Sequence, residues 1–230
     1  LTARALGVEL LVHYGHSCLV PMDSKSQLKV LYVFVDIKID PLHFVETIKL
    51  NFELNKRIAL VSTIQFVTTL QGVRKELEEI GYKVTIPQFR PLSPGEILGC
   101  TAPVIGCADV IIYLGDGRFH LEAIMIANPK LLAYKYDPYD KKFTQEFYEH
   151  LEMKSVRLDA INKGKSSGKF GVVMGTLGRQ GNVKVVERIE TILKQNKKET
   201  AVILLSEIFP DKLKLFCNLD AFVQIACPRL

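Results

Sequence analysis

Short runs of apolar residues alternate with longer amphipathic stretches along the whole chain, and this alternation leaves few folds open to it. Strands of parallel sheets carry helices on both faces, so they read as continuous apolar runs. The pattern therefore predicts an α/β protein with mainly parallel sheets. The strand-like runs lie at residues 10–13, 28–35, 57–62, 83–86, 110–114, 131–136, 170–174, 201–205 and 221–225.

The stretches between these runs carry the start and stop signals of helices. Asp40 followed by Pro41 is typical of a helix start, because the carboxylate caps the first turn and proline suits the first helical position. Apolar residues recur at steps of three and four over residues 66–80, and Gly81 follows them as a stop signal. A similar stripe over residues 183–193 predicts another helix. We interpret these stripes as faces that pack against a sheet.

Parts of the chain repeat one another at offsets of 100 to 113 residues. Buried strands resemble each other, but a nearly constant spacing favours repeated units of one fold. The matches pair residues 9–15 with 109–115, residues 109–115 with 220–226, residues 31–34 with 131–134, and residues 57–63 with 170–176.

The repeats predict three related Rossmann-like α/β domains with parallel sheets, packed around a pseudo-threefold centre. Residues 1–40 are expected to form the C-terminal part of the first domain, residues 41–163 the second, and residues 164–230 the N-terminal part of the third. The chain opens in a helix-like stretch without an initial Met, so we expect a fragment whose first and third domains are truncated.

Composition excludes several classes of protein. Hydrophobic residues make up 48% and charged residues 24% of the chain, which excludes a disordered, collagen-like or coiled-coil protein. The net charge of +5 is modest and spread along the chain, so direct nucleic-acid binding is not expected. Five cysteines do not make a disulfide scaffold, and no apolar run is long enough to span a bilayer. A reduced, cytoplasmic setting is therefore expected.

Reactive side chains follow the three matched strands. Their ends are His16-Ser17-Cys18, residues 116–120, and Cys227-Pro228-Arg229. Ligands of α/β proteins gather at the carboxyl ends of strands. If the three units surround one centre, these ends converge on a single site.

Two glycine motifs invite a nucleotide-binding interpretation. Gly164-Lys165-Ser166 lacks the glycine that a phosphate loop needs at position 159, where Asp159 stands, so we interpret it as a linker. The segment 175–181 reads G-x-x-G-x-x-G, which departs from the dinucleotide fingerprint. It fits an anion site at a helix start and a tight strand-to-helix turn equally well.

Two cysteines stand in turn-prone contexts, since Cys100 follows Gly99 and Cys227 follows Ala226. The absence of a C-x-x-C pair excludes a zinc ribbon. Thiolates that are distant in sequence can still share an iron–sulfur cluster, while a structural role remains the alternative. Cys107 and Cys217 have no partner at metal-ligand spacing and are interpreted as structural.

Segments along the entire chain resemble, in the same order, the eukaryotic 3-amino-3-carboxypropyltransferases of diphthamide biosynthesis, of the subunit 1 type. Two segments are highly specific, His13-Tyr14-Gly15-His16-Ser17-Cys18 and Leu114-Gly115-Asp116-Gly117-Arg118-Phe119-His120. The others are Thr2-Ala3-Arg4-Ala5-Leu6-Gly7, Ile97-Leu98-Gly99-Cys100-Thr101, Ala127-Asn128-Pro129, Gly175-Thr176-Leu177-Gly178-Arg179-Gln180-Gly181-Asn182 and Ala226-Cys227-Pro228-Arg229.

The resemblance implies three α/β domains around a 4Fe–4S cluster, with one cysteine from each domain. It implies an unconventional radical enzyme that transfers the 3-amino-3-carboxypropyl group from S-adenosylmethionine to a histidine of elongation factor 2, the first step of diphthamide synthesis. The working unit is a heterodimer with the paralogous subunit 2, helped by an electron-donor protein.

Two cluster ligands follow from the resemblance. Cys100 matches the second cluster ligand of the family and Cys227 the third, while the first belongs to a motif just upstream of Thr2 in the family.

Further site residues are expected near these cysteines. Arg118 and Arg229 are candidates to pair with the substrate carboxylate, which suits the fork of a guanidinium. Asp116 is a candidate for a ribose hydroxyl or the amino group. His16 and His120 are candidates to contact the substrate or the cluster. The alternative for each is a loop residue that holds strand ends together.

Two other functions remain open on the sequence. As alternatives to the enzyme, the chain would be a non-catalytic scaffold subunit of the same heterodimer, or a nucleotide-binding α/β protein that uses residues 175–181. Thiolates at two strand-end positions favour the enzyme, because a scaffold does not need them.

Overall fold

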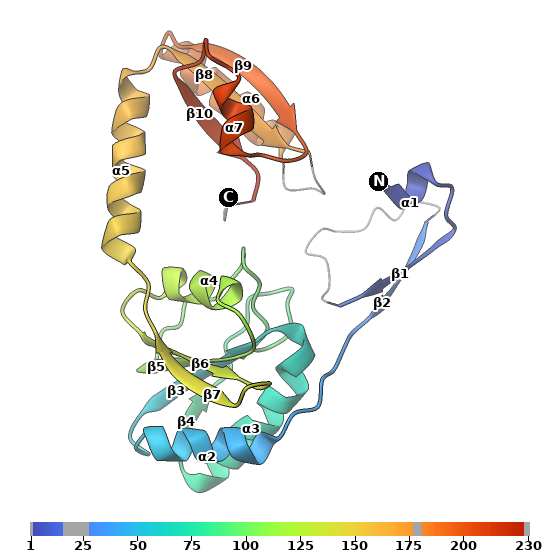
Figure 1. Ribbon diagram of the computed structural model, residues 1–230, viewed down its shortest axis with the longest axis vertical. Helices are drawn as coiled ribbons and strands as arrows, with labels where there is room; N and C mark the ends of the chain where they lie inside the picture. Colours follow the sequence, from blue (N-terminus) through green and yellow to red (C-terminus); the bar gives the residue numbers. More distant parts are fainter. Residues whose placement is uncertain (1, 16–27, 177–180, 228–230) are drawn as a thin grey trace. The chain divides into compact units, whose positions relative to one another are not determined.

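The computed structural model describes residues 2–15, 28–176 and 181–227 of the 230-residue chain (Figure 1). The described residues form three sheets and divide into two compact units, residues 1–148 and 149–230. Each part is described by itself below. The predicted α/β class with mainly parallel sheets is confirmed, whereas the division into three domains at residues 40 and 163 stays a prediction.

A parallel two-stranded sheet lies near the start of the chain. Helix α1 (Thr2–Ala5) precedes β1 (Leu10–Tyr14), and β1 pairs with β2 (Lys29–Val33) in a register that joins Leu10 to Lys29. The pairing repeats that of β5 (Val110–Leu114) with β6 (Leu132–Asp137), which is also parallel. The match of residues 9–15 with 109–115 pairs β1 with β5, but residues 31–34 and 131–134 differ by three positions in the two registers, since Val12 pairs with Leu31 and Ile112 with Tyr134.

The five-stranded sheet has the order β4-β3-β5-β6-β7 and is parallel except for β7, which runs antiparallel to β6. The apolar runs predicted four of its strands to within one or two residues. β7 was not predicted because it is a polar edge strand. The elements not yet bounded are α2 (Pro41–Asn51), β3 (Arg57–Ser62), the 3-10 helix η1 (Ile64–Phe66), α3 (Val67–Ile80), β4 (Lys83–Thr85), α4 (Phe119–Ala127) and β7 (Lys142–Glu146).

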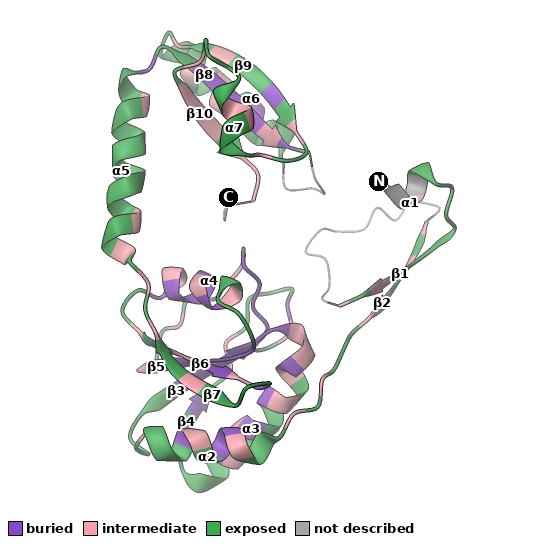
Figure 2. Cartoon of the chain, viewed as in Figure 1, coloured by how far each residue is buried: buried purple, intermediate pink, exposed green. Residues whose placement is uncertain are grey.

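Helices cover both faces of this sheet, and alternate strand residues face opposite layers. Ile58 and Leu60 of β3 pack in a core cluster with α2 and α3, whereas Ala59 and Val61 pack with α4. Buried positions concentrate in the central strands and on the helix faces turned toward them (Figure 2). The continuous apolar runs are therefore explained by burial on both sides.

The predicted helix signals act as expected. Asp40 Oδ1 accepts hydrogen bonds from the backbone N–H groups of Leu42 at 3.1 Å and His43 at 3.3 Å, so it caps α2. Gly81 ends α3 with φ = 110°, a left-handed conformation that residues with a side chain rarely adopt.

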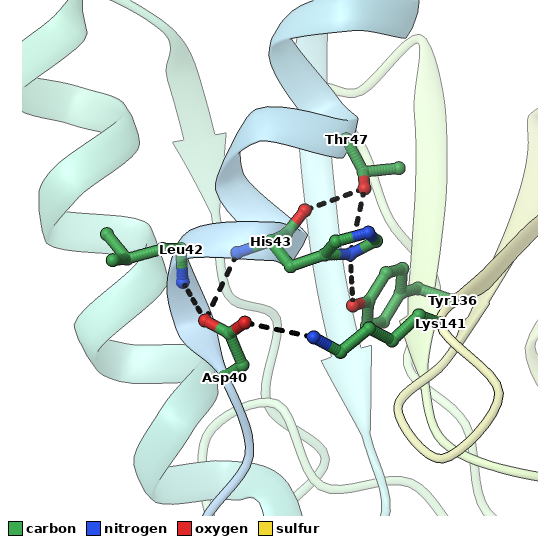
Figure 3. A network of polar contacts seen from close by, with 6 residues as sticks. All are labelled: Asp40, Leu42, His43, Thr47, Tyr136 and Lys141. Atoms are coloured by element: carbon green, nitrogen blue, oxygen red, sulfur yellow. Dashed lines mark hydrogen bonds and ion pairs between the residues drawn. The ribbon is translucent and has the colours of Figure 1, made fainter.

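A polar network fastens the start of α2 to the end of β6 (Figure 3). The Tyr136 hydroxyl and His43 Nδ1 form a hydrogen bond of 2.7 Å, with Thr47 Oγ1 at 3.4 Å from the same nitrogen. Lys141 donates to the second oxygen of Asp40 at 3.1 Å. Burial, and to a lesser degree the Asp40 charge, raises the pKa of Tyr136, which keeps its hydroxyl protonated.

The second unit contains a parallel sheet of order β10-β8-β9. The segment 164–166 forms the last turn of α5, so its interpretation as a linker was wrong. The elements are α5 (His150–Ser166), β8 (Lys169–Gly175), α6 (Val183–Gln195), β9 (Glu199–Leu205), α7 (Pro210–Lys214) and β10 (Ala221–Ile225).

The two larger sheets share one strand arrangement. β3 lies between β4 and β5, and β8 lies between β9 and β10. The sequence match of 57–63 with 170–176 pairs β3 with β8, and the match of 109–115 with 220–226 pairs β5 with β10. Matched strands therefore occupy equivalent positions in their sheets.

A carboxylate fastens the amino ends of the central strands in both units. Asp109 Oδ2 accepts from the Arg57 backbone N–H at 2.9 Å, and Asp220 Oδ2 accepts from those of Gly168 and Lys169 at 2.8 Å each. The Arg57 guanidinium, with its backbone N–H, holds the pKa of Asp109 well below its usual range. The two backbone donors likewise lower the pKa of Asp220.

Candidate functional site

The carboxyl ends of β3 and β5 form a topological switch point. From β3 the chain moves to β4 on one side of it, and then to β5 on the other. Open α/β sheets bind their ligands at the crevice that such a reversal leaves. The segments that follow these strands are therefore the first place to seek a site.

The segment that carries Cys100 continues from the end of β3. Ser62 N donates to Gly95 O at 2.8 Å, and Ile97 N donates to Ser62 O at 3.0 Å, which makes a short parallel bridge. Leu98 and Thr101 then exchange backbone hydrogen bonds of 3.1 and 3.2 Å. These bonds close a tight turn with Gly99 and the exposed Cys100 at its tip.

Gly99 makes this turn possible because the Phe119 ring lies against it. A Cβ atom added at Gly99 would overlap that ring, so only glycine fits beside Phe119 as it is placed. Phe119 is the first residue of α4, which follows the end of β5. The Cys100 turn is thus packed directly on the start of α4.

Two tyrosines hold the loop after β5 in place, one by its hydroxyl and the other by its backbone carbonyl. The fully buried Tyr113 donates its hydroxyl proton to Asp116 O at 3.2 Å, and Gly115 N donates to Tyr136 O at 3.0 Å. Burial, followed by the charge of Asp116, raises the pKa of Tyr113, so the hydroxyl stays a donor. This places the exposed Asp116 side chain at the carboxyl edge, as the sequence predicted.

Arg118 is already engaged by other groups of the protein. Its Nε donates to Glu122 Oε1 at 3.3 Å, its Nη2 donates to Phe147 O at 2.8 Å, and its Nη1 pairs with Glu146 Oε2. A substrate carboxylate would have to displace one of these partners. The geometry favours the alternative that Arg118 holds the strand end in place.

The remaining predicted residues are only partly covered by the structure. His120 lies in the first turn of α4, with its ring edge-on to Phe119 at 5.6 Å between centroids. His16 and Arg229 lie outside the described residues.

Cys227 follows β10 at the carboxyl edge of the second unit and is partly buried. β8 and β10 meet there at a switch point equivalent to that of β3 and β5. The exposed Cys107, by contrast, lies just before β5, at the opposite edge of its sheet.

Several buried oxygen atoms around the Cys100 turn have no hydrogen-bond partner within the described part of the chain. They are Ser62 Oγ, Glu96 Oε1 and Thr101 Oγ1. Native proteins satisfy nearly all buried polar atoms with protein or water. All three atoms belong to the end of β3 or to the bridged segment that carries Cys100.

Within residues 2–15, 28–176 and 181–227, no cluster of three or more His, Cys, Asp or Glu side chains could hold a metal ion. A metal centre that uses Cys100 therefore needs ligands from outside its own turn. Across the same residues, no helix is both long and apolar enough to cross a membrane.

The start of α6 is capped by a side chain of the chain itself. Residues 177–180 of the glycine segment lie outside the described residues. Asn182 Oδ1 accepts from the backbone N–H groups of Lys184 at 3.0 Å and Val185 at 3.3 Å. The helix therefore supplies its own acceptor for these donors, and the choice between the two interpretations of residues 175–181 stays a prediction.

Sequence reasoning gave no role to three residues of this region, namely Glu96, Phe119 and Glu146. Only the glycine before Cys100 hinted at a close neighbour, and nothing in the sequence showed which side chain it was. Glu146 lies on the unpredicted strand β7, 28 residues from Arg118.

Fold and site define a doubly wound α/β protein that presents a thiol near the carboxyl edge of each larger sheet. The chain belongs to the family described as "Putative diphthamide synthesis protein", whose model matches residues 1–230. The family resemblance seen in the sequence is confirmed.

Relatives of known name agree with this assignment. The chain is 58% identical over 229 residues to 2-(3-amino-3-carboxypropyl)histidine synthase subunit 1 of Nematostella vectensis. It is 54% identical over 237 residues to the protein of that name from Schizosaccharomyces pombe, and 53% identical over 231 residues to that from Homo sapiens. These matches cover 100% of this chain and 49%, 54% and 52% of the relatives, so the chain spans about half their length.

Solved structures show the same fold. The crystal structure of Dph2 from Pyrococcus horikoshii matches with a TM-score of 0.77 and 27% identity, covering 99% of this chain and 66% of that one. A second structure of that protein, with a 4Fe–4S cluster, matches with a TM-score of 0.77 and 26% identity over 99% of this chain and 67% of that one.

Proposed function

We propose that this chain is part of an enzyme that transfers the 3-amino-3-carboxypropyl group of S-adenosylmethionine to a histidine of elongation factor 2. This is the first step of diphthamide synthesis. The observation that carries the proposal is the exposed Cys100 thiol, held in a tight turn at the β3/β5 switch point. A related protein of the same fold holds a 4Fe–4S cluster, which thiolates ligate.

The residues fit such a cluster. Cys100 is exposed at one switch point, and Cys227 stands at the equivalent edge of the second unit. In the proposal each of these cysteines would supply one thiolate, as the family resemblance implies. The third thiolate would come from the motif that precedes Thr2 in the family.

The chain's own residues would hold and orient the reactants. When bound, the cluster would supply the electron that cleaves a carbon–sulfur bond of the sulfonium. Cys100 and Cys227 would supply two of its three thiolate ligands. Asp116 would accept from a ribose hydroxyl or the amino group, because its carboxylate is exposed at the same edge as the Cys100 turn.

Roles for the other predicted residues rest on their position in the family motifs. Arg229 is the better candidate for the substrate carboxylate, since Arg118 already has two carboxylate partners and a carbonyl. His16 and His120 would contact the substrate or the cluster.

The working enzyme would be a cytoplasmic heterodimer with the paralogous subunit 2. Elongation factor 2 would be its protein substrate, and an electron-donor protein would reduce the cluster. The name "subunit 1" carried by the relatives supports an assembly of several subunits.

The test measures iron and sulfide in the full-length protein after anaerobic reconstitution, together with absorption and EPR spectra. We expect about four iron and four sulfide ions per chain. Cys100→Ser and Cys227→Ser should each degrade the cluster, while Cys107→Ser should not, because Cys107 lies at the opposite edge. A folded protein that binds no iron, or equal iron in all three variants, would exclude the radical mechanism and favour the scaffold alternative.

A further inference from the structure

The guanidinium of Arg118 is held in three directions. Nε, Nη1 and Nη2 each have a separate partner, Glu122, Glu146 and the Phe147 carbonyl. A lysine ammonium could not reproduce this planar set of donors. Arg118 therefore fixes the loop after β5 to the end of β7.

Glu146 is itself fixed before it meets Arg118. Its Oε1 accepts from Thr144 Oγ1 at 2.7 Å, which leaves Oε2 for the guanidinium. Its side chain is 13% exposed, against 46% for Arg118, so water screens the pair on one side only. A carboxylate held in this way orients its partner more than a fully solvated one does.

The residue after Arg118 links this pair to the Cys100 turn. Phe119 lies against Gly99, in the space that a Cβ atom there would need. Contacts thus run without interruption from Glu146 to Arg118, to Phe119 by the chain, and to the glycine next to Cys100.

We propose that Glu146 is a positioning residue, which acts through Arg118 and Phe119 to hold the turn that presents the Cys100 thiol. The role of Cys100 as a cluster ligand rests on the proposed function, but the positioning of its thiol does not. The prediction is that loss of Glu146 loosens the start of α4, frees the Phe119 ring and exposes Cys100 further.

The experiment alkylates the full-length chain, prepared without iron, with iodoacetamide and follows each cysteine peptide by mass spectrometry. In Glu146→Ala the rate at Cys100 should rise about threefold, and the rate at Cys107 should stay unchanged. Glu146→Gln retains an acceptor for Arg118, so its rate should lie between those of the wild type and Glu146→Ala. Glu78→Ala is the matched control, because it removes only the surface pair with Arg74 on α3.

A double variant tests the path. Phe119→Leu should raise the Cys100 rate by itself, and adding Glu146→Ala should raise it little further, since both changes act on the same contact. An unchanged Cys100 rate in Glu146→Ala would overturn the proposal. So would equal rises at Cys100 and Cys107 in both Glu146 variants, which would report general loosening.

The outcome is independent of iron binding. If the reconstituted protein holds no cluster, the alkylation rates still decide whether Glu146 positions Cys100. If it does hold one, the EPR signal of Glu146→Gln should broaden or shift while that of Glu78→Ala should not.

Discussion

Removing the Tyr136 hydroxyl should loosen α2 by a predictable amount. Tyr136→Phe keeps the ring, which packs against Phe44 at 4.5 Å between centroids, so little packing is lost. The change removes the 2.7 Å hydrogen bond to His43. A neutral hydrogen bond of this kind contributes about 1 kcal/mol. Thr47 Oγ1, 3.4 Å from the same nitrogen, remains nearby, so the cost should stay below the roughly 3 kcal/mol of a fully orphaned buried group.

Hydrogen exchange of native protein measures this loss where it occurs. About 1 kcal/mol corresponds to roughly fivefold faster exchange of the α2 amides. Tyr134→Phe is the matched control on the same strand, because the Tyr134 ring stacks on Phe143 while its hydroxyl makes no hydrogen bond to another described residue. Equal exchange of α2 in the two variants would refute the reasoning.

Three further changes test the fold and its electrostatics. Leu70→Ala empties a fully buried position between α3 and the sheet and should cost about 2–5 kcal/mol by denaturant unfolding. Gly81→Ala forces a side chain into the left-handed region and should cost roughly 1–2 kcal/mol, seen as a lower Tm. The pKa of Asp109 is lowered by Arg57 in the folded protein, so its contribution is fully present above about pH 5 and is lost as the pH falls below about 4. Asp109→Asn should therefore be less stable than wild type at pH 7, and the difference in unfolding free energy should shrink toward pH 2.

Burial on both faces explains why most strands could be predicted from sequence. β3 and β5 have five buried residues each, and their apolar runs leave no other interpretation. β7 has no buried residue, and its sequence Lys-Phe-Thr-Gln-Glu resembles a loop. The strand forms because its backbone pairs with β6, and its side-chain pattern gives no sign of this pairing.

The candidate site was only half visible in the sequence. Cys100 and Asp116 stand in local motifs, and strand topology then places both at one edge. The contact of Phe119 with Gly99 and that of Glu146 with Arg118 join segments from different parts of the sheet. Such contacts depend on how strands are ordered, which no local pattern encodes.

The carboxylates at the amino edges of the two larger sheets leave the opposite edges free to differ. Asp109 and Asp220 do the same work at the start of equivalent strands. At the other end of those strands, Asp116 in one unit corresponds to Cys227 in the next, at the same offset of 111 residues. Each sheet therefore has its strand-fastening carboxylate at one edge and its exposed carboxylate or thiol at the other. A substitution at this second edge can exchange a carboxylate for a thiol while the fastening of the strands stays intact.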